Sequence, residues 1–488
     1  MKHPLTAMIT ASSSVPRWAL CLLMMLAAAI PNAARAQQPA GQVQHLQGMA
    51  TAQQPGAAAR FIAAGDSIAE GDVITTTEKG YAVVAFTDGT KITLRPATTF
   101  AVERYAHNEG TEAGLMRLIK GGMRAVTGLI NKINPGALQF RASTATIGIR
   151  GTSFDARLCN EDCRSEDRAA QSRPPPAAVL ASDLVVARLI KVSGDVTAQQ
   201  EGKPVRHLLE GAPLYMGDAL QTGPDATALV GFRDQSRLAV NPQTLVRING
   251  FSYSSARQPN NFALQLLHGG LRMFTGLIAK AQPQAVSVRT LVATIGIRGT
   301  GMDISCEGPC ADGAGTGEGA SPAPALLAAG DGLFMHTWLG LTFLDGGGSS
   351  VDVPLDAVGF VGADRMPRLL AALPEFMNSF KVPRPDMESV DWDALFGAQA
   401  YSGEDGLYLF VRDGHVFLET ANGRRDFGVG EAGFVGGDNL PRRLAPPVPR
   451  FLSDDPFPIP ELFVSGDKRI LQLFGATLGQ PGQEICRL

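Results

Sequence analysis

The sequence has few of the residues and motifs on which enzymes, metalloproteins and nucleic-acid-binding proteins depend. Its 488 residues include only 7 histidines and 3 tryptophans. It contains neither a His-Glu-x-x-His zinc motif nor a Gly-x-Ser-x-Gly nucleophile turn. The formal net charge is −3 and no run of basic residues occurs, which argues against a nucleic-acid partner. We therefore predict no catalytic residue, no cofactor and no nucleic-acid site.

Long apolar runs are also missing, apart from one near the start of the chain. Lys2 and Arg17 precede an apolar stretch over residues 18–30, and Ala34-Arg35-Ala36 forms a small-x-small cleavage site before Gln37. The stretch is short for a bilayer span, so an uncleaved membrane anchor is the weaker alternative. We expect a signal peptide over residues 1–36, cleaved after Ala36. The mature protein is then periplasmic or secreted, with no integral membrane span.

What the sequence does contain is a long internal repeat. Residues 145–152 recur letter for letter at residues 293–300, and the Gly-Gly-x-Arg segment at residue 121 recurs at residue 269, both at an offset of 148. Farther upstream, Phe86-x-Asp88 matches Phe232-x-Asp234 at an offset of 146. An identical octapeptide inside a wider collinear match indicates a duplicated structural unit.

Within each copy, apolar residues alternate with a period of two. Ala82, Val84 and Phe86 would share one face of a strand, and Asp88-Gly89 is typical of a hairpin turn. The 55 glycines and 32 prolines also fit many short strands and turns. The second copy reads Asp234-Gln235 at this turn, so we expect a looser turn there.

A shorter repeat follows with an offset of 74, in which residues 359–362 match residues 433–436. We predict hairpin repeats over residues 331–370 and 405–444. Polar or Gly/Ala/Pro-rich linkers are expected at residues 164–185 and 311–330, extended or mobile, and a Pro-rich tail at residues 445–488. Residues 369–380 could form a short helix.

The repeated elements together resemble the FecR domain. The motifs that carry this resemblance are a Gly-Asp with a following Thr, a Phe-x-Asp turn, a Leu-x-x-Gly-x-x-Arg segment and a closing Gly-Ile-Arg-Gly-Thr. They read Gly71-Asp72 with Thr75, Phe86-x-Asp88-Gly89, Leu118 to Arg124 and Gly148 to Thr152 in the first copy, and Gly217-Asp218 with Thr222, Phe232-x-Asp234, Leu266 to Arg272 and Gly296 to Thr300 in the second.

The resemblance covers about residues 41–310 and implies a mainly β fold. It implies two tandem FecR-like units of stacked, solenoid-like strand pairs, over residues 41–163 and 186–310, followed by the two hairpin repeats. Well-known family members are transmembrane regulators with a cytoplasmic sigma-factor-binding arm, which a chain that starts with a signal peptide would lack. FecR domains usually continue into a further strand pattern that is missing after the first copy. Residues 405–444 could therefore complete the first copy in space.

Two cysteine pairs follow the repeated octapeptide with the same spacing, Cys159 with Cys163 and Cys306 with Cys310. In an exported protein such pairs are expected to form disulfides, each contributing about 2 kcal/mol for so small a loop. A metal site is the alternative, but no histidine is near either pair. Cys486 is left over, either free or bridged to another chain.

The Gly-Ile-Arg-Gly-Thr element is glycine-rich and cationic, yet it lacks the Lys and the following helix of a phosphate-binding loop. We interpret it as a bend between strand segments, with its arginine bonded to local carbonyls or an acid. The residues that define this motif in the two copies are Gly148, Arg150, Gly151, Thr152, Gly296, Arg298, Gly299 and Thr300.

The residues shared by the copies are glycines, turn aspartates, apolar strand positions and an arginine, with no repeated nucleophile or base. These types shape a β unit, so we expect an interaction or signal-receiving module whose partner is an envelope protein or a surface polymer. A glycan-active enzyme would need two acids about 5 to 9 Å apart in a groove. A small-ligand sensor would need an enclosed apolar pocket.

Overall fold

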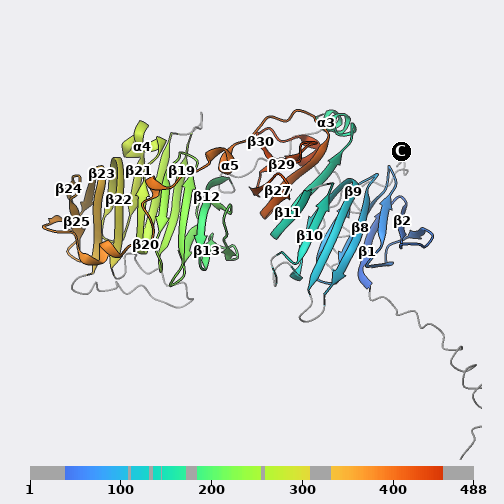
Figure 1. Cartoon of the computed structure of the whole chain (residues 1–488), viewed down its shortest axis with the longest axis horizontal. Coiled ribbons are helices and arrows are strands. Elements are labelled where there is room, and N and C mark those ends of the chain that lie inside the picture. Colours follow the sequence, from blue (N-terminus) through green and yellow to red (C-terminus); the bar gives the residue numbers. More distant parts are fainter. Residues whose placement is uncertain are drawn as a thin grey trace, which may run out of the picture. The chain divides into compact units, whose positions relative to one another are not determined.

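The computed structural model describes residues 39–107, 112–130, 134, 136–143, 145–171, 184–253, 259–307 and 331–453. The predicted signal peptide, Cys310, Cys486 and the tail beyond Ser453 lie outside these residues. The described chain forms two β domains, each built on a 15-stranded sheet (Figure 1). The prediction of a mainly β fold is therefore confirmed. No helix in these ranges is long and apolar enough to cross a membrane.

The first domain combines the N-terminal strands with the last strands of the described chain. Its elements are β1 (Pro39–Gln47), β2 (Ala50–Gln53), β3 (Arg60–Ile62), β4 (Ser67–Ala69), β5 (Val73–Thr76), β6 (Tyr81–Phe86), β7 (Lys91–Leu94), β8 (Thr99–Ala106), β9 (Ala113–Val126), β10 (Leu138–Ala142), β11 (Ala145–Cys159), α3 (Cys163–Gln171), β27 (Gly406–Thr420), β28 (Gly423–Gly428), β29 (Ala432–Val435), β30 (Pro441–Leu444) and α6 (Arg450–Ser453).

The second domain is continuous in sequence, and its residues lie between the two chain segments that form the first domain. Its elements are β12 (Val185–Ser193), β13 (Val196–Gln199), β14 (Arg206–His207), β15 (Pro213–Tyr215), β16 (Ala219–Thr222), β17 (Thr227–Phe232), β18 (Arg237–Val240), β19 (Leu245–Ser252), β20 (Asn261–Phe274), α4 (Leu277–Ala281), η2 (Pro283–Ala285), β21 (Val286–Arg289), β22 (Thr294–Glu307), β23 (Gly332–Gly346), β24 (Ser349–Val353), β25 (Val358–Val361) and β26 (Pro367–Leu370), followed by η3 (Glu375–Ser379), η4 (Pro385–Met387) and α5 (Trp392–Phe396).

Long strands change partners halfway along their length in both domains. In the first domain, β9 pairs with β8 and β10 through its first half and with β7 and β11 through its second half. In the second domain, β20 divides in the same way between β19 and β21, and then β18 and β22. Each sheet therefore doubles over into two layers. The matching strand order confirms that the two copies share one fold.

The first domain is completed by a strand from far along the chain. Strand β27 pairs with β11 along its whole length, from Cys159 opposite Gly406 to Thr146 opposite Glu419 (Figure 1). In the second domain β23 pairs with β22 in the same register. The prediction that residues 405–444 complete the first copy is thus confirmed, and the second domain is an insertion into the first.

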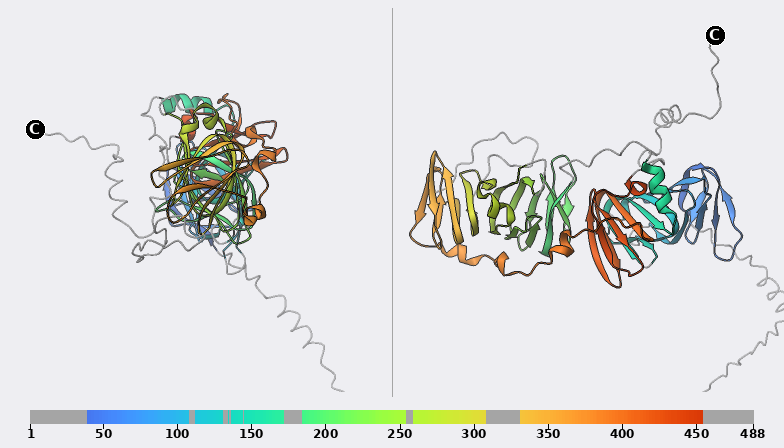
Figure 2. Two further views of the ribbon diagram at one scale, coloured as in Figure 1. Left: turned by 90° about the vertical axis from the view of Figure 1, so that its left-hand side faces the viewer. Right: turned by 90° about the horizontal axis from the view of Figure 1, so that it is seen from above.

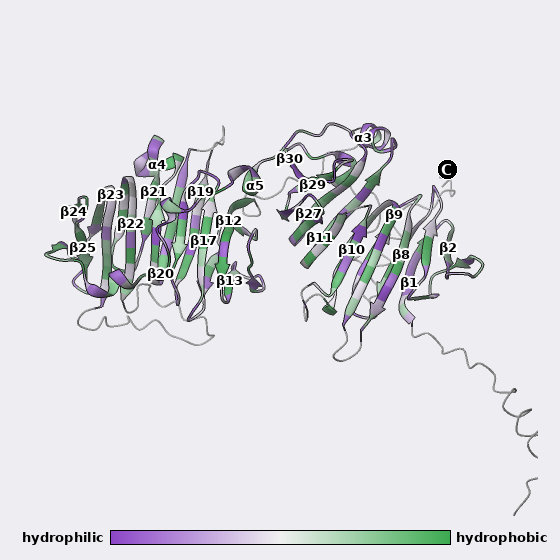
Figure 3. Cartoon of the chain, viewed as in Figure 1, coloured by the Kyte–Doolittle hydropathy of each residue, from purple (hydrophilic) through white to green (hydrophobic). Residues whose placement is uncertain are grey.

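Apolar side chains fill the space between the layers of each domain. In the first domain, Val84 and Ile92 of the early hairpin share one core with Leu409 and Val416 of β27. The alternation of apolar and polar residues along the strands, visible as green and purple bands in Figure 3, places one side of each strand in this core. The core of the first domain therefore depends on both of its chain segments.

Two local expectations were wrong, and a third was met in part. Residues 163–171 form α3 and not an extended linker, because the chain turns into a helix directly after Asp162. The short helix expected over residues 369–380 is confirmed in part, because η3 forms over Glu375–Ser379 after the end of β26. The turn at Gln235 is as tight as its counterpart, since Gln235 adopts a φ of 67° and donates its N–H to Phe232 over 2.9 Å.

Candidate functional site

The Gly-Ile-Arg-Gly-Thr element lies in mid-strand, where β11 and β22 pass from one layer to the other. The register with the partner strand shifts between Arg150 and Ser153 in β11 and between Arg298 and Gly301 in β22. Gly299 has a φ of 70°, which favours glycine. The motif therefore marks an irregularity inside one long strand, and the tight bend at Gly148 and Gly151 stays a prediction. The predicted bond of Arg150 to a carbonyl or an acid stays a prediction, because the Arg150 side chain lies outside the part of the chain that the structure describes.

The first glycine of the motif makes room for an aromatic ring on the partner strand. A Cβ atom on Gly148 would lie 1.9 Å from the ring of Phe417, and one on Gly296 would lie 1.9 Å from Phe343. Arg298 is exposed and its guanidinium lies 5.9 Å from the centroid of the Phe343 ring. The first glycine of the motif therefore serves strand pairing in both copies, and in the second copy Arg298 contacts an aromatic ring.

The repeated aspartates stabilise turns, as predicted. Asp88 accepts hydrogen bonds from the Thr90 amide at 3.0 Å and from the Thr90 hydroxyl at 2.7 Å, and Asp234 binds Ser236 in the same way. Asp72 is fully buried, accepts from the Ala69 amide and pairs with Arg60 at 2.9 Å. Asp72 therefore also holds an ion pair, which the sequence reading did not predict.

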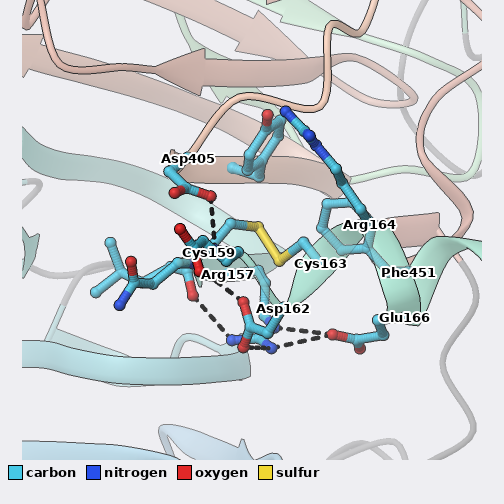
Figure 4. Close-up of a disulfide and its surroundings, with 12 residues drawn as sticks. Arg157, Cys159, Asp162, Cys163, Arg164, Glu166, Asp405 and Phe451 are labelled. Carbon is cyan, nitrogen blue, oxygen red and sulfur yellow. Dashed lines mark hydrogen bonds and ion pairs between the residues drawn. A yellow bond between two sulfur atoms is a disulfide. The ribbon is translucent and has the colours of Figure 1, made fainter.

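A disulfide joins Cys159 at the end of β11 to Cys163 at the start of α3, as predicted (Figure 4). Beneath it, Arg157 pairs with Asp162 at 2.7 Å and with Glu166 at 3.1 Å. Burial raises the pKa of Asp162, but the Asn160 amide and Arg157 outweigh it and hold this pKa below its usual range. The disulfide and these ion pairs, which we call the disulfide corner, therefore fix α3 against the sheet.

The disulfide corner also receives the chain that returns to the first domain. The Glu161 amide donates to Asp405 at 2.7 Å, and Arg164 donates to the carbonyl of Gly403 at 2.7 Å (Figure 4). Both sulfurs pack in a small cluster with Phe451 of α6. In the second domain Cys306 is likewise disulfide-bonded. Its predicted pairing with Cys310 stays a prediction because Cys310 lies outside the described residues.

A buried acid on one face of each sheet was missed by the sequence reading. Asp155 is fully buried and pairs with Arg95 at 3.1 Å and Arg412 at 2.5 Å. Its counterpart Asp303 pairs with Arg272 at 3.2 Å and accepts from the indole N–H of Trp338 at 2.8 Å. The sequence does contain a feature that could have indicated these acids: Asp155 and Asp303 recur at the offset of 148, each three residues after the Gly-Thr dipeptide.

Residues 380–396, which we call the return segment, cover this face of the second domain (Figure 2). Val382 packs on Leu229 and Ala239, and Arg384 lies 3.9 Å from the centroid of the Trp338 ring. Arg272 lies 5.3 Å from the Phe380 ring centroid, and Arg237 lies 5.7 Å from that of Trp392. Cation–π contacts and one apolar cluster therefore hold the return segment.

Further hydrogen bonds fix the backbone of the return segment. Arg237 donates to the carbonyls of Pro385 at 2.9 Å and Glu388 at 2.7 Å. The Lys381 amide donates to the side-chain oxygen of Asn241 at 3.2 Å. The Lys191 ammonium also pairs with Glu388 at 2.5 Å.

The two domains differ at the outer edge of their last strand. In the first domain the C-terminal end of β30 is covered, because Gln399 forms a bridge to Leu444 and its carbonyl accepts from the Ala445 amide at 2.7 Å. In the second domain β26 pairs only with β25 within the described ranges. The side chains of Met366 just before β26, Leu369 within it and Leu355 between β24 and β25 are exposed to 46%, 48% and 56%. The second domain thus presents an apolar sheet edge.

An open groove of 650 Å³ lies on the outer side of β5, β8 and β9. Its one acid, Glu103, is paired with Arg117 at 2.5 Å. This groove does not have the two-acid arrangement of a glycosidase. Among the described residues no group of three or more His, Cys, Asp or Glu is placed to hold a metal ion.

Comparison with known proteins bears on these features. Residues 72–169 and 218–312 match the model of the FecR protein family. One segment in each β domain is thus similar to the FecR family, and the predicted resemblance is confirmed.

Two crystal structures of a proposed anti-sigma factor from Parabacteroides distasonis are similar to this chain. Their identities are 12% and 11%, their TM-scores are 0.22 and 0.21, and each match covers 31% of this chain. The match spans 57% of the length of that protein. No curated protein matches the chain.

Proposed function

We propose that this chain is an exported, non-catalytic FecR-domain protein that binds another protein of the cell envelope. The observation that carries this proposal is the edge of β26, where Met366 and Leu369 are exposed beside a strand paired on one side within the described residues. Such an edge offers backbone N–H and C=O groups to an added strand, and the apolar side chains provide specificity.

Comparison with the corresponding edge of the first domain supports placing the proposed partner site on the second domain. Met366 and Leu440 occupy the same position of the 74-residue repeat, but Gln399 covers β30 at its C-terminal end. One edge is therefore available for a partner while its counterpart is used internally.

The test is capture of envelope proteins by the chain from Gln37 to Leu488. The double variant Met366→Lys and Leu369→Lys should lose the specific partner about tenfold or more, because charged edge residues oppose strand addition. Leu440→Lys is the matched control and should capture the partner normally. Equal capture by the parent, the double variant and Leu440→Lys would contradict the proposal. Retention of a polysaccharide instead of a protein would favour a surface polymer as the partner.

Export has its own test. The intact mass of protein recovered from the periplasm or medium should correspond to a chain that begins at Gln37. Recovery of protein that retains residues 1–36, or only from the cytoplasm, would contradict export.

A further inference from the structure

The first part of the return segment contacts the second domain through every second side chain. Phe380, Val382 and Arg384 face the sheet, whereas Lys381 and Pro383 between them are exposed. The backbone is close to polyproline II, with φ and ψ of −56° and 119° at Phe380 and −65° and 127° at Arg384. Within the described residues, no strand pairs with residues 380–390. The segment therefore lies on the sheet as an extended peptide ligand does, and not as one of its strands.

Two arginines of the second domain bind the backbone of this segment. Arg237 donates to the carbonyls of Pro385 at 2.9 Å and Glu388 at 2.7 Å, and Arg272 donates to the carbonyl of Val382 at 3.2 Å. Every peptide carries such carbonyl groups, so these contacts provide affinity for any extended chain of suitable shape. Selection among sequences then depends on the side-chain contacts, as in other modes of peptide recognition.

The groups that contact the segment are held in place by the second domain itself. Asp303 of β22 is buried, pairs with Arg272 of β20 at 3.2 Å and accepts from the indole N–H of Trp338 of β23 at 2.8 Å. The guanidinium and the ring are thus oriented by an acid that belongs to the sheet. Because these groups do not need the return segment to order them, the face is preorganised for a ligand, which lowers the cost of binding.

We propose that this face of the second domain is a peptide-binding site in which the return segment is an internal ligand, and that an extended segment of another chain can replace it. The sequence that fits is an aliphatic residue followed by Pro-Arg-Pro. The aliphatic side chain fills the place of Val382 on Leu229 and Ala239, and the arginine takes the place of Arg384 on the Trp338 ring. Replacement requires only local opening, because the return segment has no strand pairing to break. The proposal is independent of the proposed function, which uses the edge of β26.

Tryptophan fluorescence tests binding of a free peptide. All proteins begin at Gln37 and carry Trp392→Phe, which leaves Trp338 as the one tryptophan of the chain. The probe is a synthetic peptide of residues 380–390. A protein with Arg384→Ala, a half-exposed position, should bind this peptide roughly tenfold more tightly than the parent, because its weakened internal ligand competes less well from a high effective concentration. A peptide with Val382→Asp and Arg384→Ala is the control and should not bind. Equal binding of the two peptides, or no gain in affinity in an Arg384→Ala protein that has the parent's urea transition, would overturn the proposal.

A protein in which the internal ligand is locked provides a second measurement. Ala239 and Val382 pack in one cluster, so Ala239→Cys with Val382→Cys should form a disulfide that holds the return segment on the face. The locked protein should not change its Trp338 fluorescence at any concentration of the 380–390 peptide, whereas the parent should respond at high concentration. A locked protein that binds the peptide as the parent does would show that the peptide binds elsewhere, and would overturn the proposal.

Discussion

The insertion of one domain into the other makes a strong prediction about fragments. A chain of residues 37–171 contains the whole first copy, including the Cys159–Cys163 disulfide, but lacks β27 to β30. Strand β11 would lose its partner on one side along twelve paired positions. The core would lose seven buried apolar side chains, namely Leu407, Leu409, Val411, Val416, Leu418, Phe427 and Val435.

The expected loss exceeds what the fragment can tolerate. Burial of such side chains contributes roughly 1.5–3 kcal/mol each, which sums to roughly 10–20 kcal/mol. The whole unfolding free energy of a domain is only about 5–15 kcal/mol. We therefore expect the 37–171 fragment to be unfolded.

Circular dichroism with urea titration checks this expectation, using two controls. Residues 37–171 joined to 397–453 through a short Gly/Ser linker should unfold cooperatively, because that chain restores β27 to β30. Residues 184–396, the second domain with its return segment, should also unfold cooperatively. A cooperative transition for 37–171 alone would refute the reasoning that the C-terminal strands are part of the first domain.

Three further predictions concern single sites. Gln235→Gly should stabilise the second domain by about 0.5–1 kcal/mol in urea titration, because Gln235 has a φ of 67°. Gly89→Gln, at a φ of 85°, should destabilise the first domain. Equal stability of the parent and the Gln235→Gly protein would contradict the strain argument. Cys163→Ser should lower the stability of the first domain by about 2 kcal/mol, and reductant should then have no further effect there. Burial raises the pKa of Asp426, but the hydrogen bond and charge of His415 together with Arg424 outweigh it and hold this pKa at about 2. The folded pKa lies below the unfolded value, so the contribution of Asp426 to the unfolding free energy is present above about pH 4 and is lost as the pH falls toward 2. Between pH 5 and pH 2.5, the unfolding free energy measured by urea titration should fall less in the Asp426→Asn protein than in the parent.

The repeats made most of the fold predictable from sequence. Period-two alternation around Val84 and the Asp88 turn depend on neighbouring residues, so local patterns were sufficient. The role of Gly148 was only partly predictable, since the ring that it accommodates belongs to Phe417 on a distant strand. That pairing is set by tertiary contacts that no local pattern encodes.

The candidate surfaces were harder to predict. Asp303 looks like a polar residue on a solvent-facing strand side, and its burial comes from Trp338 and the segment above it. Helix α3 was not predicted because its sequence has no apolar periodicity. It is stabilised instead by the disulfide and by the ion pair of Arg157 with Asp162. In both cases the decisive partners are distant in sequence.

The pairing of β11 with β27 also determines the order in which the molecule can fold during synthesis. Cys159 and its partner Gly406 are 247 positions apart. At about 5–20 residues per second, translation separates the two strands by about 12–50 s. During this time the second domain can be completed while β11 presents an unpaired edge. The inserted domain is thus expected to fold before the domain that surrounds it, and the waiting edge of β11 is the place where a chaperone would be needed most.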